Sequence, residues 1–213
     1  MITTPQKTPN SQRPKSLPQL LAARVAGLVL AVGLLGCGSG ADADDAVAAA
    51  NEANRERIGN AAEIVEKQAA DARFLVRATA NARLEVELGK LAQAKANSAP
   101  VRAYGTRLIS SRLALLDALQ ALATRKNLVL PAALGEDEQE AFHEASQKTG
   151  NQLDKQVMDL VVKTQRQDED AFDDMADDAY DPDLRRLATA ELPPLRELLA
   201  AAKQVQDQAD DLP

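Results

Sequence analysis

The chain has 213 residues, with 25 Lys and Arg against 32 Asp and Glu, and therefore a formal net charge of −7 at pH 7. An acidic chain without a basic cluster repels phosphate backbones, so we expect no nucleic-acid partner. The single cysteine excludes an intrachain disulfide, and we therefore expect the fold to depend on its apolar core alone.

The first 36 residues have the pattern of a secretory signal peptide. Residues 1–24 contain four basic side chains and no acidic one, and the uncharged run "VAGLVLAVGLL" follows at 25–35. This run is shorter than the roughly 20 residues that a spanning helix needs. A transmembrane anchor that begins at Leu17 is the alternative, but it would place Arg24 inside the hydrocarbon. We expect residues 1–36 to be a lipoprotein signal peptide.

The lone cysteine directly follows the apolar run, in "LLGC" with Cys37 last. This motif is similar to the lipobox of bacterial lipoproteins, in which the cysteine becomes the lipidated first residue of the mature chain. The resemblance implies a diacylglyceryl group, which supplies the two acyl chains that stable anchoring requires. We expect an exported protein, anchored in the cell envelope through Cys37. If the cell has two membranes, we expect it on the periplasmic side of the outer membrane.

Removal of the signal takes away four basic residues, so the net charge of the mature chain becomes −11. Residues 37–60 are small, polar and then rich in alanine, and we interpret them as the lipidated cysteine with a flexible to helical tether. A further hypothesis is that the alanine-rich stretch 43–62 binds other envelope proteins. Good helix formers dominate residues 61–209, which we expect to form one helical domain, followed by a tail at 210–213.

Turn residues divide the helical domain into four long segments, each with an apolar stripe at helical spacing. Ser98 stands two residues before Pro100 and Asp181 directly before Pro182, and a capping residue with a proline in the first turn is typical of a helix start. The loop 127–135 and the break at Gly150 bound a short extra helix before the third long segment. We predict an all-α, antiparallel four-helix bundle, with a kink in the fourth helix at Pro193 and Pro194. The four segments are about 71–97, 101–126, 152–179 and 183–207.

Polar residues interrupt each apolar stripe near its middle. If the helices align, these residues lie at a similar height inside the bundle, where polar groups must be bonded or coordinate an ion. Carboxylates projecting inward from facing helices are typical of metal sites in bundles, and oxygen ligands suit a hard cation. The alternative, which we favour, is that they lie at the edge of the core, bonded to arginine or to backbone. The candidate ligands are Glu85, Asp168 and Glu191, and the other interruptions are Ser111, Thr164 and Gln165.

One residue and five short stretches follow one another along the four segments: Phe74, "EVELGKLA" (85–92), "PVRAYGTRLI" (100–109), "LDKQVMDLVVK" (153–163), "DPDLRRLA" (181–188) and "LPPLREL" (192–198). In this order and spacing they resemble the bacterial domain of unknown function 4142, a family of ferritin-like envelope proteins often labelled "predicted outer membrane protein". The resemblance covers about 130 residues, from Asp71 to Lys203. It implies a ferritin-like helical bundle in a commonly exported protein, and it implies no established reaction.

The chain departs from this family at its histidines. The resemblance implies Asp-His pairs in the second and third helices and a histidine in the fourth. The only histidine, His143, falls in the short extra helix, where we expect a surface or packing residue. The positions of the implied pairs and of the fourth-helix histidine hold Ser111, Arg112, Thr164, Gln165 and Leu198, and only Glu85 matches.

No motif for nucleophilic catalysis and no glycine-rich phosphate loop accompanies these segments. We therefore expect a non-enzymatic binding or structural module that needs no cofactor. The alternative is a ferritin-like oxidoreductase or metal store that holds a divalent metal at a degenerate carboxylate site.

Overall fold

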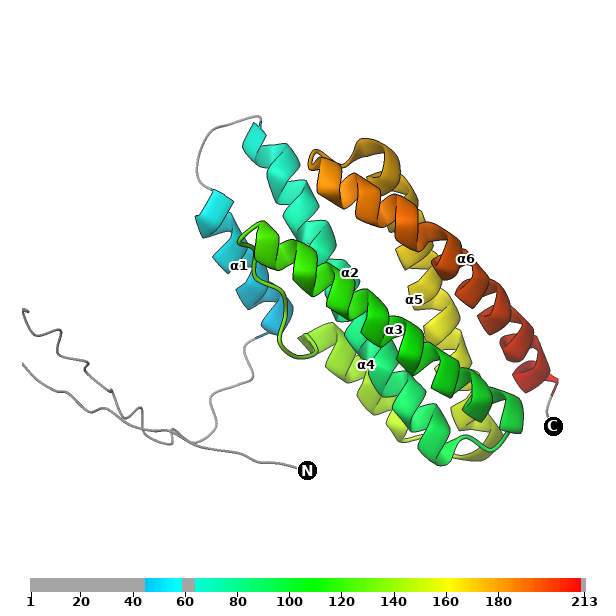
Figure 1. Cartoon of the computed structure of the whole chain (residues 1–213). Coiled ribbons are helices and arrows are strands. Elements are labelled where there is room, and N and C mark those ends of the chain that lie inside the picture. Colours follow the sequence, from blue (N-terminus) through cyan, green and yellow to red (C-terminus); the bar gives the residue numbers. More distant parts are fainter. Residues whose placement is uncertain (1–44, 59–63, 212–213) are drawn as a thin grey trace, which may run out of the picture. The chain divides into compact units, whose positions relative to one another are not determined.

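The computed structural model describes residues 45–58 and 64–211 (Figure 1). Within these ranges the chain is all-α, as predicted: it forms six helices and no strand. None of these helices combines the length and the apolar character that crossing a membrane requires. The helices are α1 (Ala46–Ile58), α2 (Ile64–Lys95), α3 (Ala99–Arg125), α4 (Glu136–Ser146), α5 (Gly150–Asp178) and α6 (Pro182–Asp210).

The predicted helix starts after Ser98 and Asp181 are both present. The Ser98 hydroxyl accepts a hydrogen bond from the Val101 amide at 3.3 Å, and a carboxylate oxygen of Asp181 accepts one from the Asp183 amide at 2.7 Å. Each cap satisfies backbone donors that have no partner inside the helix. The prolines at 193 and 194 lie within α6 and do not end it. The first long helix begins at Ile64, earlier than the sequence pattern indicates.

The short extra helix is α4, and a further helix, α1, forms within the stretch that we interpret as a tether. Figure 1 shows α1 beside the N-terminal half of α2, and the two helices are in contact. The side chain of Asn54 on α1 makes two hydrogen bonds with the loop after α3. Its amide donates to the carbonyl of Val129 at 2.8 Å, and its oxygen accepts from the Val129 amide at 2.7 Å.

The four long helices pack as two hairpins, α2–α3 and α5–α6, with further contacts between α2 and α5 and between α3 and α6. Figure 1 shows the two hairpins side by side. Their apolar side chains form two core clusters, and every long helix contributes to both. We call the cluster around Leu88, Leu108, Met158 and Leu198 the first core cluster, and the one around Leu75, Leu119, Phe172 and Leu184 the second.

Each hairpin supplies an aspartate that accepts hydrogen bonds from backbone amides in the turn of the other; we call these crossed bonds. Asp71, in the N-terminal part of α2, accepts hydrogen bonds from the amides of Tyr180 and Asp181 in the α5–α6 turn, at 3.1 and 2.7 Å. Asp154, at the start of α5, accepts hydrogen bonds from the amides of Asn97 and Ser98 in the α2–α3 turn, at 2.8 and 2.7 Å. These crossed bonds satisfy turn amides that a buried helix end would otherwise leave without acceptors.

A constant separation of 83 residues relates the paired positions. It connects Asp71 to Asp154 and Ser98 to Asp181, the residues of the two crossed caps. The two hairpins are therefore a structural repeat, in sequence register as well as in space.

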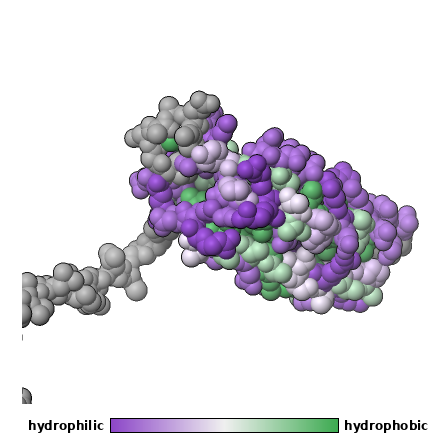
Figure 2. Space-filling view, turned by 45° about the horizontal axis from the view of Figure 1, so that its top comes forward, coloured by the Kyte–Doolittle hydropathy of each residue, from purple (hydrophilic) through white to green (hydrophobic). Residues whose placement is uncertain are grey.

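The α2–α3 hairpin is closely packed where two glycines meet. A β-carbon on Gly105 would lie 2.8 Å from the carbonyl oxygen of Gly89, and one on Gly89 would lie 2.8 Å from Ile109. Backbone cannot move aside as a flexible side chain can, so these positions require glycine for helix proximity. The surface seen in Figure 2 is mainly hydrophilic, and apolar residues appear on it in smaller areas.

Candidate functional site: a buried polar layer

Polar side chains form a layer between the two core clusters, near the middle of the four long helices. Arg112 on α3 and the layer residues of α5 fall between residues of one cluster and residues of the other, and on α2 Asn81 and Glu85 flank the change from the second cluster to the first; Tyr104 also belongs to the first core cluster. The predicted alignment of the polar interruptions is correct for Glu85 and Asp168, which meet in this layer. Its members are Asn81 and Glu85 from α2, Tyr104 and Arg112 from α3, and Gln165 and Asp168 from α5.

A guanidinium lies between the two carboxylates. Arg112 Nε is 3.0 Å from Glu85 Oε2, and Arg112 Nη1 is 3.6 Å from Asp168 Oδ2. The Arg112, Glu85 and Asp168 side chains are 1%, 0% and 2% exposed. A buried charge is costly without a partner, so the three side chains compensate one another. Arg112 thus carries the positive charge of the layer.

Amide side chains complete the layer. Asn81 donates a hydrogen bond to Asp168 Oδ1 at 2.6 Å. Gln165 donates to the Tyr104 hydroxyl at 2.9 Å, and this hydroxyl lies 3.3 Å from the Leu198 carbonyl oxygen, to which it donates. Tyr104 therefore connects α3 with both α5 and α6.

Two carboxylates share one guanidinium, and the protonation of the layer follows from this ratio. Burial raises the pKa of Glu85 to about 8; Arg112 opposes this shift, and the charge of Asp168 adds to it. Burial also raises the pKa of Asp168 to about 6, against the opposing effects of Arg112 and of the Asn81 hydrogen bond. Because two buried carboxyl groups face one guanidinium, the pair favours keeping one proton at neutral pH, which leaves the layer without net charge. Burial raises the pKa of Tyr104 as well, which keeps its hydroxyl protonated.

The remaining sequence candidates lie around this layer. Glu191 on α6 is half-buried; its burial raises its pKa, and the charge of Arg112 opposes the shift. Thr164 is buried next to Gln165, and Ser111 is half-buried next to Arg112. Leu198 is buried in the first core cluster. His143 is exposed on α4, and Cys37 lies outside the described residues.

The donor set of the layer fits an internal ion pair better than a metal. Glu85 and Asp168 are oxygen ligands, but the guanidinium of Arg112 lies between them. A metal ion would have to displace it or sit beside a fixed positive charge. Among the described residues, no group of three or more His, Cys, Asp or Glu side chains has the arrangement to hold a metal.

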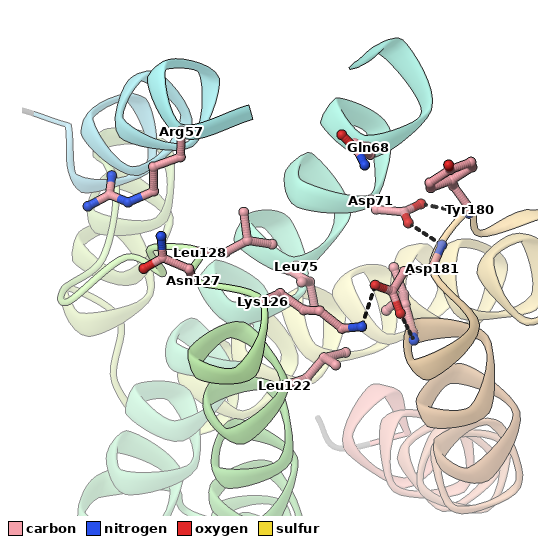
Figure 3. A pocket seen from close by; sticks show the side chains of 11 residues that line it. Arg57, Gln68, Asp71, Leu75, Leu122, Lys126, Asn127, Leu128, Tyr180 and Asp181 are labelled. Carbon is pink, nitrogen blue, oxygen red and sulfur yellow. Dashed lines mark hydrogen bonds and ion pairs between the residues drawn. The ribbon is translucent and has the colours of Figure 1, made fainter. Parts of the chain in front are cut away.

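Among the cavities beside the long helices, two contain charged residues described above. The first, the end cavity of about 250 Å³, lies beside the α5–α6 turn and is lined by Asp71, Lys126 and Tyr180, among others (Figure 3). Two of its charged groups have charged or backbone partners: Asp71 accepts the two hydrogen bonds from the α5–α6 turn, and Lys126 Nζ lies 2.6 Å from Asp181 Oδ2 and 2.7 Å from Asp183 Oδ2. Arg57, which also lines the cavity, donates to the carbonyl of Ala53 at 2.8 Å. The second, the side cavity of about 310 Å³, lies between α2 and α5 and reaches Asn81 and Asp168 of the polar layer.

These features define an all-helical domain of two hairpins around a buried, charge-compensated layer, in which each hairpin accepts hydrogen bonds from the turn of the other. The chain belongs to the family described as "Domain of unknown function (DUF4142)", which matches residues 56–205. Comparison with curated proteins and with solved structures gives no match.

The sequence pattern identified two of the carboxylates and predicted an arginine as a partner, but it did not identify Arg112 as that arginine. It also placed the carboxylates at the edge of the core, whereas Glu85 and Asp168 are 0% and 2% exposed. Arg112 entered only as a departure from the resembled family, although its position in the stripe of the second long segment was the available signal. Asp71 and Asp154 were missed altogether. Their equal spacing from the two turns was the signal that could have found them.

Proposed function

We propose that this protein is exported and anchored in the cell envelope by a lipid on Cys37, and that its DUF4142 domain is a non-enzymatic binding or structural module. The anchor is supported by the apolar run and the lipobox-like "LLGC" ending at Cys37. In a cell with two membranes we propose the periplasmic side of the outer membrane, and other envelope proteins as partners.

We propose that the four long helices form a ferritin-like antiparallel bundle. The support is the order in which each helix passes the two core clusters. Along the chain, α2 and α6 contribute to the second cluster and then to the first, whereas α3 and α5 contribute in the opposite order. Contacts join α2 to α3 and α5, and join α6 to the same two helices, so every contacting pair of long helices runs in opposite directions.

The observation that carries the non-enzymatic proposal is the guanidinium of Arg112 between Glu85 and Asp168. In a metal-dependent bundle, the inward carboxylates hold a cation that is exchangeable or reactive. Here the cation is covalently part of the chain, which favours a fixed structural role for the layer.

Metabolic labelling with a palmitate analogue tests the anchor. We expect the wild-type protein to be labelled and to fractionate with membranes, and we expect Cys37→Ser to lose both properties. Labelling that is unchanged in Cys37→Ser would show that the anchor is not at this residue.

Elemental analysis of the full-length protein, purified in detergent, tests the alternative of a metal store at Glu85, Asp168 and Glu191. Glu85→Ala removes a carboxylate of the layer, and Glu87→Ala on the same helix is the matched control outside it. We expect no stoichiometric iron or manganese in any of the three proteins. Metal that is present in the wild type and in Glu87→Ala, but absent from Glu85→Ala, would establish the metal store instead.

A further inference from the structure

Helix α1 is the first described element after Cys37, and it is an addition to the four-helix bundle. The family match begins at residue 56 and therefore covers only the last turn of α1, which spans Ala46–Ile58. Among the described residues, neither core cluster includes one from α1. The bundle therefore keeps both apolar cores whether α1 is packed against it or not.

The contact that holds α1 in place is narrow. Only two of the described side chains of α1 are buried, Ala50 and Asn54, which are 3% and 2% exposed. They lie one helical turn apart and so share one face of the helix. Asn54 makes the two hydrogen bonds with Val129 in the loop after α3. These two bonds are therefore the most specific part of a contact that otherwise consists of small and polar side chains.

Other features of the same contact oppose the packing of α1. Asn51 lies one turn before Asn54, and its side-chain oxygen is buried but accepts no hydrogen bond from the described residues. A buried acceptor without a donor costs at least as much free energy as a typical hydrogen bond contributes. A cavity of about 110 Å³, lined by Asn51 and Asn54 from α1 and by Ala69 and Ala72 from α2, also separates part of the two helices. Side chains that border a cavity lack van der Waals contacts there, so α1 is held only weakly.

We propose that α1 is a releasable strap. Packed against α2, it holds the domain near the lipid anchor; when the bonds between Asn54 and Val129 break, it leaves the bundle as a unit and becomes part of the tether. A helix of 13 residues is marginal in water without packing, so released α1 unwinds. The bundle loses neither core cluster and stays folded. This inference rests on the proposed lipid at Cys37.

Release of the strap changes how far the domain can reach from the membrane. With α1 packed, residues 38–45 connect Cys37 to the domain, and a chain of this length spans at most about 30 Å. With α1 released and unwound, residues 38–63 form the connection, which spans at most about 90 Å. The strap thus selects between a domain held close to its membrane and one that can contact partners further from it.

Hydrogen exchange of the full-length protein in detergent, measured by mass spectrometry, tests the release. We expect the amides of α1 to be protected, but to exchange at least about 100-fold faster than those around Leu88 and Phe172 in the two core clusters. Equal protection of α1 and the two clusters would overturn the proposal, because α1 would then open only with the whole domain. Full exposure of α1 to exchange would overturn it as well, because α1 would then not be packed.

Three alanine variants separate the strap from a general effect on the helix. Asn54→Ala removes both hydrogen bonds with Val129, and we expect exchange in α1 to be at least about 10-fold faster, with exchange in α5 and α6 unchanged. Asn51→Ala removes the unsatisfied oxygen, and we expect slower exchange in α1 than in the control Glu56→Ala, which changes an exposed residue of the same helix. Alanine raises helix propensity in all three variants, so only a loss of packing explains faster exchange. The proposal is overturned if Asn54→Ala leaves exchange in α1 unchanged.

Energy transfer from the domain to the bilayer tests the reach. The lipidated protein is placed in vesicles of phosphatidylethanolamine and phosphatidylglycerol with acceptor-labelled lipid, and a donor dye is attached to a cysteine introduced by Glu197→Cys, at an exposed position on α6. Because Cys37 is the one cysteine of the chain and carries the lipid, the dye reacts with the introduced thiol. We expect Asn54→Ala to lose transfer efficiency relative to Glu56→Ala, and equal efficiency in the two variants would overturn the strap. Protein that does not stay on the vesicles would instead show that the anchor is absent, so the two failures are distinguishable.

Discussion

The α2–α3 and α5–α6 hairpins have buried acidic residues at corresponding positions but differ in whether they supply a buried cation. Both carry, in the N-terminal part of their first helix, a buried aspartate that accepts hydrogen bonds from the turn of the other hairpin. Both place a buried carboxyl group 14 residues later, Glu85 in one and Asp168 in the other. The same 83-residue separation relates these two carboxylates. Only the α2–α3 hairpin supplies a buried cation, because the position that corresponds to Arg112 is Leu195. The repeat is therefore symmetric in its buried carboxyl groups and asymmetric in its buried cation.

The two hairpins also differ in the residues at the positions where α2 and α3 meet through glycines. The positions that correspond to Gly89 and Gly105 are Phe172 and Ala188, both fully buried. Phe172 fills space in the second core cluster and contacts Phe74 of the other hairpin, with ring centroids 4.9 Å apart. The α2–α3 hairpin thus has two glycines whose backbones meet, and at the corresponding position the α5–α6 hairpin has an aromatic side chain that packs against the other hairpin. Changes at corresponding positions should have unequal effects.

The largest effect is expected from Arg112→Leu, which gives α3 the residue found at the corresponding position of α6. Glu85 and Asp168 would then be buried without a cation, and we expect a loss of about 3–5 kcal/mol in the free energy of unfolding, measured with urea. Arg107→Leu, an exposed arginine on the same helix, is the control and should change stability by less than about 0.5 kcal/mol. The triple variant Arg112→Leu, Glu85→Gln and Asp168→Asn should recover much of the loss. A cost of Arg112→Leu below about 1 kcal/mol would mean that the layer does not need its cation.

The second-largest effect is expected from the aspartates that accept hydrogen bonds from the turn of the other hairpin. Asp71→Ala leaves two turn amides of the other hairpin without acceptors, and we expect it to cost about 2–3 kcal/mol. The decisive measurement is hydrogen exchange by NMR: Asp71→Ala should expose the amides of Tyr180 and Asp181. Asp154→Ala should instead expose those of Asn97 and Ser98. If each substitution affects only its own hairpin, the crossed arrangement is wrong.

The pH dependence of stability tests the shared guanidinium. The pKa of Glu85 is raised from 4.5 to about 8, so its contribution to stability is complete below pH 4.5 and is lost as the pH rises to about 8. Asp168 acts in the same direction between pH 3.8 and about 6. Between pH 6 and 8 we expect a loss of about 2 kcal/mol, which Glu85→Gln should remove and Glu87→Gln should not. An equal slope for Glu85→Gln and the wild type would contradict the raised pKa.

The smallest effect is expected from Gly105→Ala, which gives α3 the residue that α6 has at position 188. Overpacking against the Gly89 carbonyl costs about 1–3 kcal/mol, and the higher helix propensity of alanine returns about 1 kcal/mol, so we expect a net loss of about 1 kcal/mol in urea unfolding. A crystal structure of the variant should show α2 and α3 further apart near these residues. A stabilised Gly105→Ala protein would mean that the close approach is not needed.

The fold was largely predictable, because helix formers, capping residues and apolar periodicity act locally. In the sequence, Ser98 and Asp181 indicated two helix starts, and Gly150 indicated another. The start of α2 was less predictable, since alanine-rich sequence upstream of Asp71 has no strong cap to mark it. The docking of α1 depends on Asn54 meeting Val129, which lies 75 residues away in the sequence.

The site was predictable only in part. A buried carboxylate interrupts an apolar stripe, so Glu85 and Asp168 stood out from their helices alone. What compensates them depends on how the helices face one another, and a long arginine side chain such as Arg112 can point to the core or to water with the same sequence pattern. The hydrogen bond between Tyr104 and Gln165 joins residues 61 positions apart, which periodicity cannot reveal.

The crossed aspartates have a consequence for how this protein folds. The bonds made by Asp154 span about 57 residues and those made by Asp71 about 110, so neither turn is complete until distant parts of the chain have met. A repeat of two similar hairpins could in principle fold as two independent units. Here each unit lacks an acceptor that only the other provides, so the helices should acquire their final stability in one cooperative step rather than in two.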